Sequence, residues 1–261
     1  MIKKIVWVVL SVSILLSIIF TTGFITSLNI IRSGEKEIME LPKMQTNDKE
    51  NSTENLTNSN LKILIMGDSI GYGIGDEENL GIGKRYQDLM NTENQTKLEI
   101  TNISVPGYES DDLGVLIKSQ ENQSIIAEAD LIIISIGGND LNRLKYTDEL
   151  TMSISFKETV KKYKENIETI INEIRTVNTD SQLAFIGLYD PFDKKEPQKT
   201  KFLLEWNYET RLIIDTDLKS SYIPTYEEFE YHLDEFLSAD RFHPSAEGYQ
   251  IIAEALYRIL N

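Results

Sequence analysis

Residues 61–75, LKILIMGDSIGYGIG, place one serine and one acid directly after an apolar run. An apolar run without alternation is typical of a strand that is buried on both faces of a parallel sheet. Gly67 allows a sharp turn after this strand, so the hydroxyl of Ser69 is expected to stand exposed at the carboxyl edge of the sheet. A serine on a strand-to-helix turn is a candidate nucleophile. The alternative is a surface loop that uses glycine only for its backbone angles.

A serine hydroxyl attacks a carbonyl group poorly unless a base removes its proton. The chain contains two histidines, His232 and His243. Asp240 lies three residues before His243, close enough to hold the imidazole nitrogen that faces away from the serine and so to fix the tautomer. His232 lies among acidic residues in a segment typical of an exposed helix. We therefore predict that Ser69 is the nucleophile, His243 its base and Asp240 the partner that orients the base.

Ester cleavage develops negative charge on the former carbonyl oxygen, and hydrogen-bond donors aimed at this oxygen stabilise the charge. Two further glycine-containing segments follow apolar runs, SVPG at 104–107 and GGND at 137–140. The backbone N–H groups of Ser69 and Gly107 and the side-chain amide of Asn139 are three candidate donors. Taken singly, each segment is equally compatible with an ordinary turn. Their order, and their position after successive strands, favour one common site.

The elements that must position these residues alternate along the chain. Apolar runs predict strands at 61–66, 98–104, 130–136, 182–189 and 222–226. The intervening stretches predict helices at 82–92, 110–128, 156–177, 197–220 and 246–260. In 156–177 the apolar residues recur at spacings of four and three, which lays one apolar stripe along a helix. Strands separated by helices require crossover connections, and this predicts a mostly parallel sheet with helices on both faces.

Together, these segments resemble the four sequence blocks of the SGNH hydrolase superfamily, also called the GDSL-type esterases and lipases. The blocks read GDSI with Ser69, SVPG with Gly107, GGND with Asn139, and DRFH with Asp240 and His243. The resemblance covers 61–260 and implies an α/β fold, a three-layer α/β/α sandwich with a five-stranded parallel sheet of the flavodoxin-like type. It also implies a serine esterase or lipase, with the catalytic and oxyanion-hole roles assigned above. The isoleucine after Ser69 replaces the usual leucine, which is a conservative apolar change.

Charge and composition limit the partners. The formal net charge of −16 argues against nucleic acid and against an anionic bilayer surface as partners. The chain has no cysteine, which removes disulfides, thiolate metal sites and a cysteine nucleophile. The sequence shows no metal-ligand spacing, and we expect neither a metal nor another cofactor. The expected partner is an acyl ester, either of a small molecule or of a glycan or lipid.

Residues 5–31 contain no charged residue over 27 positions and follow Lys3 and Lys4. A membrane span needs about 20 apolar residues, and lysines before a span favour a cytoplasmic amino terminus. We expect 1–32 to be an uncleaved transmembrane anchor; a cleavable signal segment, which would give a secreted protein, is the main alternative. The polar segment 33–60 is expected to be a flexible tether. The hydrolase domain would then occupy 61–261, outside the cytoplasm.

Two other functions fit parts of the sequence. A binding module on the same fold would keep a pocket without turnover, although the intact serine, histidine and acid favour an enzyme. The glycines of GYGIGDEENLG suggest a phosphate cradle, but the lysine and Ser/Thr of a P-loop are missing and the dinucleotide fingerprint is not matched.

For the esterase, O-acetylated sugars and lysophospholipid-type lipids are the expected substrates.

The sequence also suggests which residues surround the substrate. Tyr72, Tyr108 and the region 192–206 are candidates for the lining of an acyl or sugar pocket, although core packing explains them equally well. The connections 141–155 and 191–200 are long enough to form a lid.

Overall fold

The computed structural model describes residues 61–94, 98–144, 148–192 and 197–261. They belong to one of two compact units of the chain, 55–261. The expected anchor at 1–32 and tether at 33–60 lie outside the described residues. Within the four described ranges, we find no helix with the length and apolarity needed to span a bilayer.

A five-stranded sheet forms the centre of the fold, and every neighbouring pair of strands is parallel. The strands are β1 (Leu61–Gly67), β2 (Leu98–Asn102), β3 (Leu131–Ser135), β4 (Gln182–Ile186) and β5 (Ser220–Ile223). Their order is β2-β1-β3-β4-β5. All five residues of the central strand β3 are buried, as expected for an apolar run without alternation. The predicted flavodoxin-like parallel sheet is confirmed.

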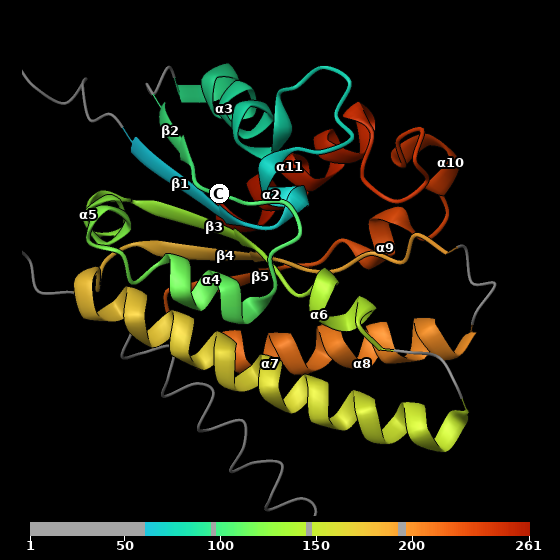
Figure 1. Ribbon diagram of the computed structural model, residues 1–261. Helices are drawn as coiled ribbons and strands as arrows, with labels where there is room; N and C mark the ends of the chain where they lie inside the picture. The colour runs from blue at the N-terminus through green and yellow to red at the C-terminus, as the bar shows by residue number, and fades with distance from the viewer. Residues whose placement is uncertain (1–60, 95–97, 145–147, 193–196) are drawn as a thin grey trace, which may run out of the picture. The chain divides into compact units, whose positions relative to one another are not determined.

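Helices cover both faces of the sheet and complete the predicted three-layer sandwich (Figure 1). One face carries α4 (Ser110–Leu116), α5 (Gln120–Glu128), α7 (Glu149–Val177) and α8 (Pro197–Ile214). The other face carries α3 (Gly81–Asn94) and α11 (Ala246–Leu260), with the short helices α9 (Tyr226–Phe229) and α10 (Leu233–Phe236). The one-turn helices α2 (Ser69–Tyr72) and α6 (Gly138–Asn142) follow β1 and β3.

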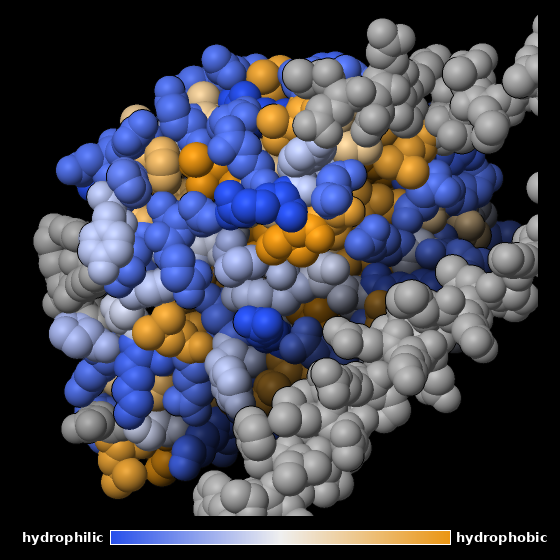
Figure 2. All heavy atoms as spheres, turned by 180° about the vertical axis from the view of Figure 1, so that it is seen from behind, coloured by the Kyte–Doolittle hydropathy of each residue, from blue (hydrophilic) through white to orange (hydrophobic). Residues whose placement is uncertain are grey.

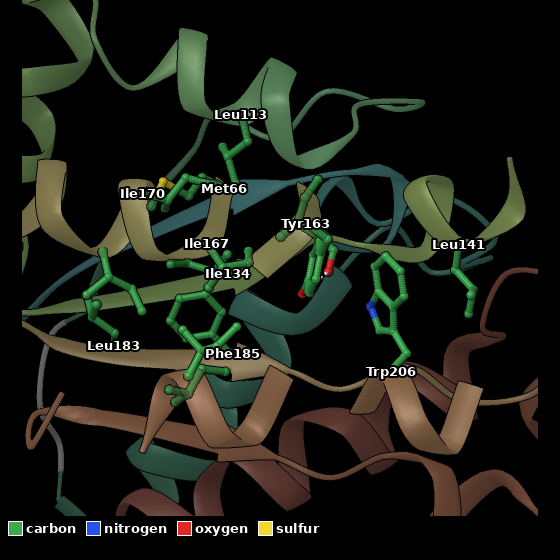
Figure 3. Close-up of a cluster of buried hydrophobic side chains, with 14 of the residues drawn as sticks. Met66, Leu113, Ile134, Leu141, Tyr163, Ile167, Ile170, Leu183, Phe185 and Trp206 are labelled. Atoms are coloured by element: carbon green, nitrogen blue, oxygen red, sulfur yellow. Dashed lines mark hydrogen bonds between the residues drawn. The ribbon is translucent and has the colours of Figure 1, made fainter. Parts of the chain in front are cut away.

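Alternate residues of β1 and β3 point into two separate cores. Met66 and Ile134 belong to the core beneath α7 and α8, whereas Ile63 belongs to the core beneath α3 and α11. Figure 3 shows Met66 and Ile134 close to Ile167 and Ile170 of α7. The apolar stripe predicted for 156–177 is therefore the buried face of α7. On the side opposite to the view of Figure 1, apolar side chains form small separate patches among hydrophilic ones (Figure 2).

The boundaries of several elements differ from those expected, and side-chain caps explain two of the differences. The expected helix 110–128 is two helices, because the side chain of Ser119 accepts the N–H of Asn122 and starts α5 anew. The long helix α7 begins at 149, not 156, because Asp148 caps it by accepting the N–H of Thr151. Helix α8 ends at 214 instead of 220. The second, third and fourth strands are shorter than expected, and the fifth begins and ends earlier, at 220 and 223 instead of 222 and 226.

Candidate active site

Ser69 is the first residue of α2, at the carboxyl end of β1. The turn before it is fixed at both ends: the N–H of Asp68 donates to the carbonyl oxygen of Ser135 on β3 at 2.8 Å, and the carboxylate of Asp68 accepts the N–H of Ile70 at 3.0 Å. Gly67 has a φ of 140°, and a Cβ there would lie 1.8 Å from the same Ser135 oxygen. Only glycine therefore lets β1 turn this close to β3.

The structure brings Ser69, His243 and Asp240 together. The Nε2 atom of His243 lies 2.9 Å from Oγ of Ser69, which is 174 residues away in sequence. The Nδ1 atom of the same ring lies 2.7 Å from Oδ2 of Asp240. The second histidine, His232, has a half-exposed side chain next to Glu235 and is not part of this cluster. The preference for His243 over His232 thus agrees with the geometry.

Asp240 also shapes the loop that carries the histidine. Its Oδ1 atom accepts the N–H groups of Phe242 and His243 at 2.8 and 2.9 Å and the hydroxyl of Ser238 at 2.8 Å. Burial raises the pKa of the Asp240 carboxyl, but the hydrogen bonds from the His243 ring and from the backbone outweigh it and hold the pKa well below its usual range. The carboxylate therefore stays ionised at neutral pH.

Contacts from distant elements hold this loop and the loop after β1, and no local sequence pattern indicated them. The hydroxyl of Tyr189 donates to the carbonyl oxygen of Phe242 at 2.8 Å, and that of Tyr249 donates to the carbonyl oxygen of Ile74 at 2.8 Å. Burial raises the pKa of both tyrosines, so both hydroxyls keep their protons. At Gly75 a Cβ would lie 2.8 Å from the Cβ of His243. These contacts bring the loop after β1 against the histidine.

The three candidate oxyanion donors face the same edge of the sheet. The side-chain amide of Asn139 donates one hydrogen bond to the carbonyl oxygen of Tyr108 at 2.9 Å, which leaves its second N–H for a ligand. Gly107 has a φ of 87° and open space where a Cβ would stand. The backbone N–H groups of Ser69 and Gly107 have no acceptor among the described residues.

A second link joins the Gly107 segment to the Asn139 segment, and the sequence analysis missed it. The carboxylate of Asp140 accepts the N–H of Ser110 at 3.0 Å and its hydroxyl at 2.5 Å. Asn166 of α7 donates to the Ser110 hydroxyl at 2.8 Å. Burial raises the pKa of Asp140. The sequence feature that could have indicated this link is the acid directly after Asn139 in the GGND block.

An apolar pocket opens beside Ser69 and Asn139. Its apolar lining comprises Ile70, Leu141, Leu188, Pro191, Phe192, Leu203 and Phe242. Of the aromatic residues considered from sequence, Phe192 lines this pocket, whereas Tyr72 is 57 % exposed and does not. Trp206 is fully buried against Tyr163 in the core, as Figure 3 shows. The described part of 141–155 is largely helical, in α6 and α7.

No cluster of three or more His, Asp or Glu side chains suited to a metal ion occurs among the residues that the structure describes. The groups placed to act chemically at the site are the hydroxyl of Ser69, the imidazole of His243 and the three hydrogen-bond donors. A serine and an imidazole in contact, with a carboxylate behind the imidazole, at the carboxyl edge of a parallel α/β sheet are typical of a serine hydrolase.

The family model of the GDSL-like lipases/acylhydrolases matches residues 63–256. The chain belongs to this family and is a carboxylic ester hydrolase. It is 28 % identical over 219 residues to the uncharacterized protein YpmR of Bacillus subtilis, covering 81 % of this chain and 86 % of the relative. It is 24 % identical over 202 residues to the spore germination lipase LipC of Bacillus licheniformis, covering 75 % and 94 %.

Solved structures share the fold. The lipase Lip_vut3 from a goat rumen metagenome matches with a TM-score of 0.70 at 24 % identity, covering 76 % of this chain and 96 % of that one. The acetylxylan esterase Axe2 of Geobacillus stearothermophilus matches with a TM-score of 0.57 at 21 % identity, covering 77 % and 94 %. At these identities the likeness shows the fold alone.

The burial of the Asp68 carboxyl, beside Ser69, makes its contribution to folding stability depend on pH. Asp68 is 3 % exposed, and burial raises its pKa from 3.8 to about 6, although the N–H of Ile70 and the hydroxyl of Ser135 act in the opposite direction. Because the folded pKa lies above the unfolded one, the folded protein binds the extra proton between these two values. The contribution of Asp68 to stability is therefore full below pH 3.8 and falls as pH rises to about 6.

We predict that Asp68→Asn, which keeps the helix cap but cannot ionise, gains stability relative to the wild type as pH rises. Between pH 4 and pH 7 the difference in free energy of unfolding should shift toward the variant by about 2 kcal/mol. Urea denaturation of both proteins across this range measures the shift. A difference that does not change with pH would show that the Asp68 carboxyl titrates normally.

Proposed function

We propose that this protein cleaves acyl esters through a covalent acyl-serine intermediate, in a domain that a membrane anchor holds outside the cytoplasm. The observation that carries the mechanism is the chain of two hydrogen bonds from Ser69 through the His243 ring to Asp240, at 2.9 and 2.7 Å. Such a chain lets a hydroxyl lose its proton as it attacks, because the resulting imidazolium is stabilised by the carboxylate behind it.

The reaction proceeds in two halves. Oγ of Ser69 attacks the ester carbonyl carbon while Nε2 of His243 takes the hydroxyl proton, and the carbonyl oxygen becomes an oxyanion that accepts from Ser69, Gly107 and Asn139. The C–O bond to the alcohol then breaks, and His243 returns the proton to the departing alcohol. In the second half, water attacks the acyl-serine, its proton passes to His243 and then back to Ser69, and the free acid leaves.

The substrates that we propose are O-acetylated sugars or lysophospholipid-type lipids. Similar proteins include both a lipase and an acetylxylan esterase by name, and the spore germination lipase is a curated relative. The net charge of −16 disfavours polyanionic partners such as nucleic acid.

The central prediction concerns Ser69. Purified protein should hydrolyse p-nitrophenyl esters, and Ser69→Ala should abolish this activity because it removes the hydroxyl that the His243 ring contacts. Asn139→Ala should lower kcat by about 100- to 1,000-fold, because one of the three donors to the oxyanion is lost. A fluorophosphonate probe should label the wild type but not Ser69→Ala.

Two results would contradict this mechanism. Activity retained by Ser69→Ala would remove the serine from the reaction. A wild-type protein that is folded, does not react with the probe and hydrolyses no ester would instead support the alternative function, a binding module on the same fold. Urea denaturation of each variant controls for misfolding.

The membrane anchor is supported by the uncharged stretch 5–31 and by the polar segment 33–60 that separates it from the domain. We predict that the full chain sediments with membranes after washing with high salt, and that protease added to intact cells with the outer face exposed removes the domain. Recovery of a shortened, freely released domain would favour a cleaved signal segment. A domain that the protease cannot reach would place it on the cytoplasmic side.

A further inference from the structure

We propose that the pocket beside Ser69 binds an aliphatic acyl chain, so that the enzyme prefers medium-chain over acetyl esters, and that Asp190 and Thr200 set this preference by positioning Phe192. The inference rests on the proposed esterase function and selects among its substrates.

The pocket lies on the acyl side of the reacting carbonyl group. It is lined by Ser69 and Asn139, which hold the carbonyl carbon and its oxygen in the proposed mechanism. The ring of His243, which must reach the departing oxygen of the alcohol, does not line it. A group that extends from the carbonyl carbon into this pocket is therefore the acyl chain and not the alcohol.

The walls of the pocket are apolar and come from four segments of the chain. Leu141 comes from α6, Leu203 from α8, Phe192 from the segment between β4 and α8, and Phe242 from the loop before α11. The Phe192 and Phe242 rings have centroids 6.5 Å apart, and Phe242 meets the His243 ring edge-on at 5.1 Å. The aromatic pair thus forms a wall that runs away from the reacting centre.

Besides Ser69 and Asn139, the pocket is lined by the polar side chains of Asn142 and Lys199, but those of Asp190, Tyr189 and Asp68 are already paired within the protein. Both carboxylate oxygens of Asp190 accept hydrogen bonds, and the hydroxyl of Tyr189 donates to the carbonyl oxygen of Phe242. The carboxylate of Asp68 accepts from Ile70 and Ser135. A sugar ring would need free donors and acceptors for its hydroxyls, and burying them unpaired is costly. An alkyl chain has no such requirement and gains free energy from the apolar walls.

Asp190 fixes the position of the aromatic wall. Its side chain is buried, with Oδ1 accepting the N–H of Phe192 at 2.9 Å and Oδ2 accepting the hydroxyl of Thr200 on α8 at 2.5 Å. The ammonium group of Lys199 lies over the Phe192 ring, 4.8 Å from its centroid. Phe192 is thereby held to the first turn of α8, although it belongs to the preceding loop. Asp190 and Thr200 are positioning residues that do not touch the reacting atoms.

The test compares chain-length profiles at a constant leaving group. The full-length protein in lipid nanodiscs is assayed with p-nitrophenyl acetate, butyrate, hexanoate and octanoate. For the wild type we expect kcat/KM to rise about fourfold for each methylene that the walls bury. Phe192→Ala should lower kcat/KM for octanoate by about tenfold or more while changing that for acetate less than threefold. Tyr208→Ala, an aromatic truncation on the exposed face of α8, should keep the wild-type profile.

Two substitutions of Thr200 test whether Asp190 and Thr200 position Phe192. Thr200→Val removes the hydroxyl that Asp190 accepts and should reduce the octanoate-to-acetate ratio without lowering the rate on acetate. Thr200→Ser retains the hydroxyl and should restore the ratio. Equal labelling of every variant by a fluorophosphonate probe confirms that the reacting residues remain in place.

The possible failures are distinguishable. A wild type that hydrolyses acetate as well as or better than octanoate overturns the acyl-chain inference and leaves the esterase function standing. An equal loss on all four esters in Phe192→Ala assigns this residue to general packing and overturns its role in selectivity. Unchanged ratios in Thr200→Val overturn the positioning role. No turnover of any ester, together with no labelling by the probe, overturns the proposed function itself.

Discussion

The contact between the His243 ring and the Ser69 hydroxyl is the interaction on which this structure depends. The two residues are 174 positions apart, yet their side chains must meet at 2.9 Å. A parallel sheet makes this possible because the carboxyl ends of its strands share one edge, so loops from distant parts of the sequence converge there. The hydrogen bonds of Asp68 and Asp240 fix the positions of these two side chains.

Fixing both side chains requires rigid turns on both sides of the contact. On the serine side, the cap from Asp68 and the close approach of Gly67 to Ser135 set the direction of α2. On the histidine side, Asp240 accepts from the backbone of the same loop in which it orients the ring. The hydroxyl of Tyr249 in α11 holds the loop after β1 at Ile74, and the hydroxyl of Tyr189 after β4 holds the histidine loop at Phe242. Such rigidity is what positions a reacting group to within a fraction of an ångström.

The carboxylates around the site have different roles because their environments differ. Asp240 accepts several hydrogen bonds and stays ionised beside the imidazole. Asp68 and Asp140 are more deeply buried, and burial raises the pKa of both. Asp140 ties the Gly107 and Asn139 segments together through Ser110, and Asp68 caps the helix that begins at Ser69. Burial of these two carboxyl groups is unfavourable when they are ionised, but their hydrogen bonds fix the backbone geometry of the site.

The sequence was sufficient for the parts of this molecule that have local patterns. Unalternated apolar runs identified the strands, and the blocks around Ser69, Gly107, Asn139 and His243 identified the residues that meet at the sheet edge. It was insufficient where a contact joins distant segments, as between Asp190 and α8 or between Tyr189 and the histidine loop. It also failed to separate aromatic residues by function, because Trp206 in the core and Phe192 in the pocket wall have the same local character.

Helix starts were misplaced for a related reason. Asp148 and Ser119 are polar residues that suit a loop as well as a cap, and only the hydrogen bond to a following N–H distinguishes the two. The family match over 63–256 adds the reaction class, ester hydrolysis, that the fold alone would not give.

Detection of the acyl-enzyme by mass spectrometry tests the central claim most directly. The protein is mixed with an ester in excess, quenched in acid while turnover continues, and digested. The account predicts that the peptide containing Ser69 gains the mass of the acyl group less one hydrogen, and that the modification disappears once the ester is consumed. Turnover with no acylated peptide, or with the acyl group on another residue, would contradict it.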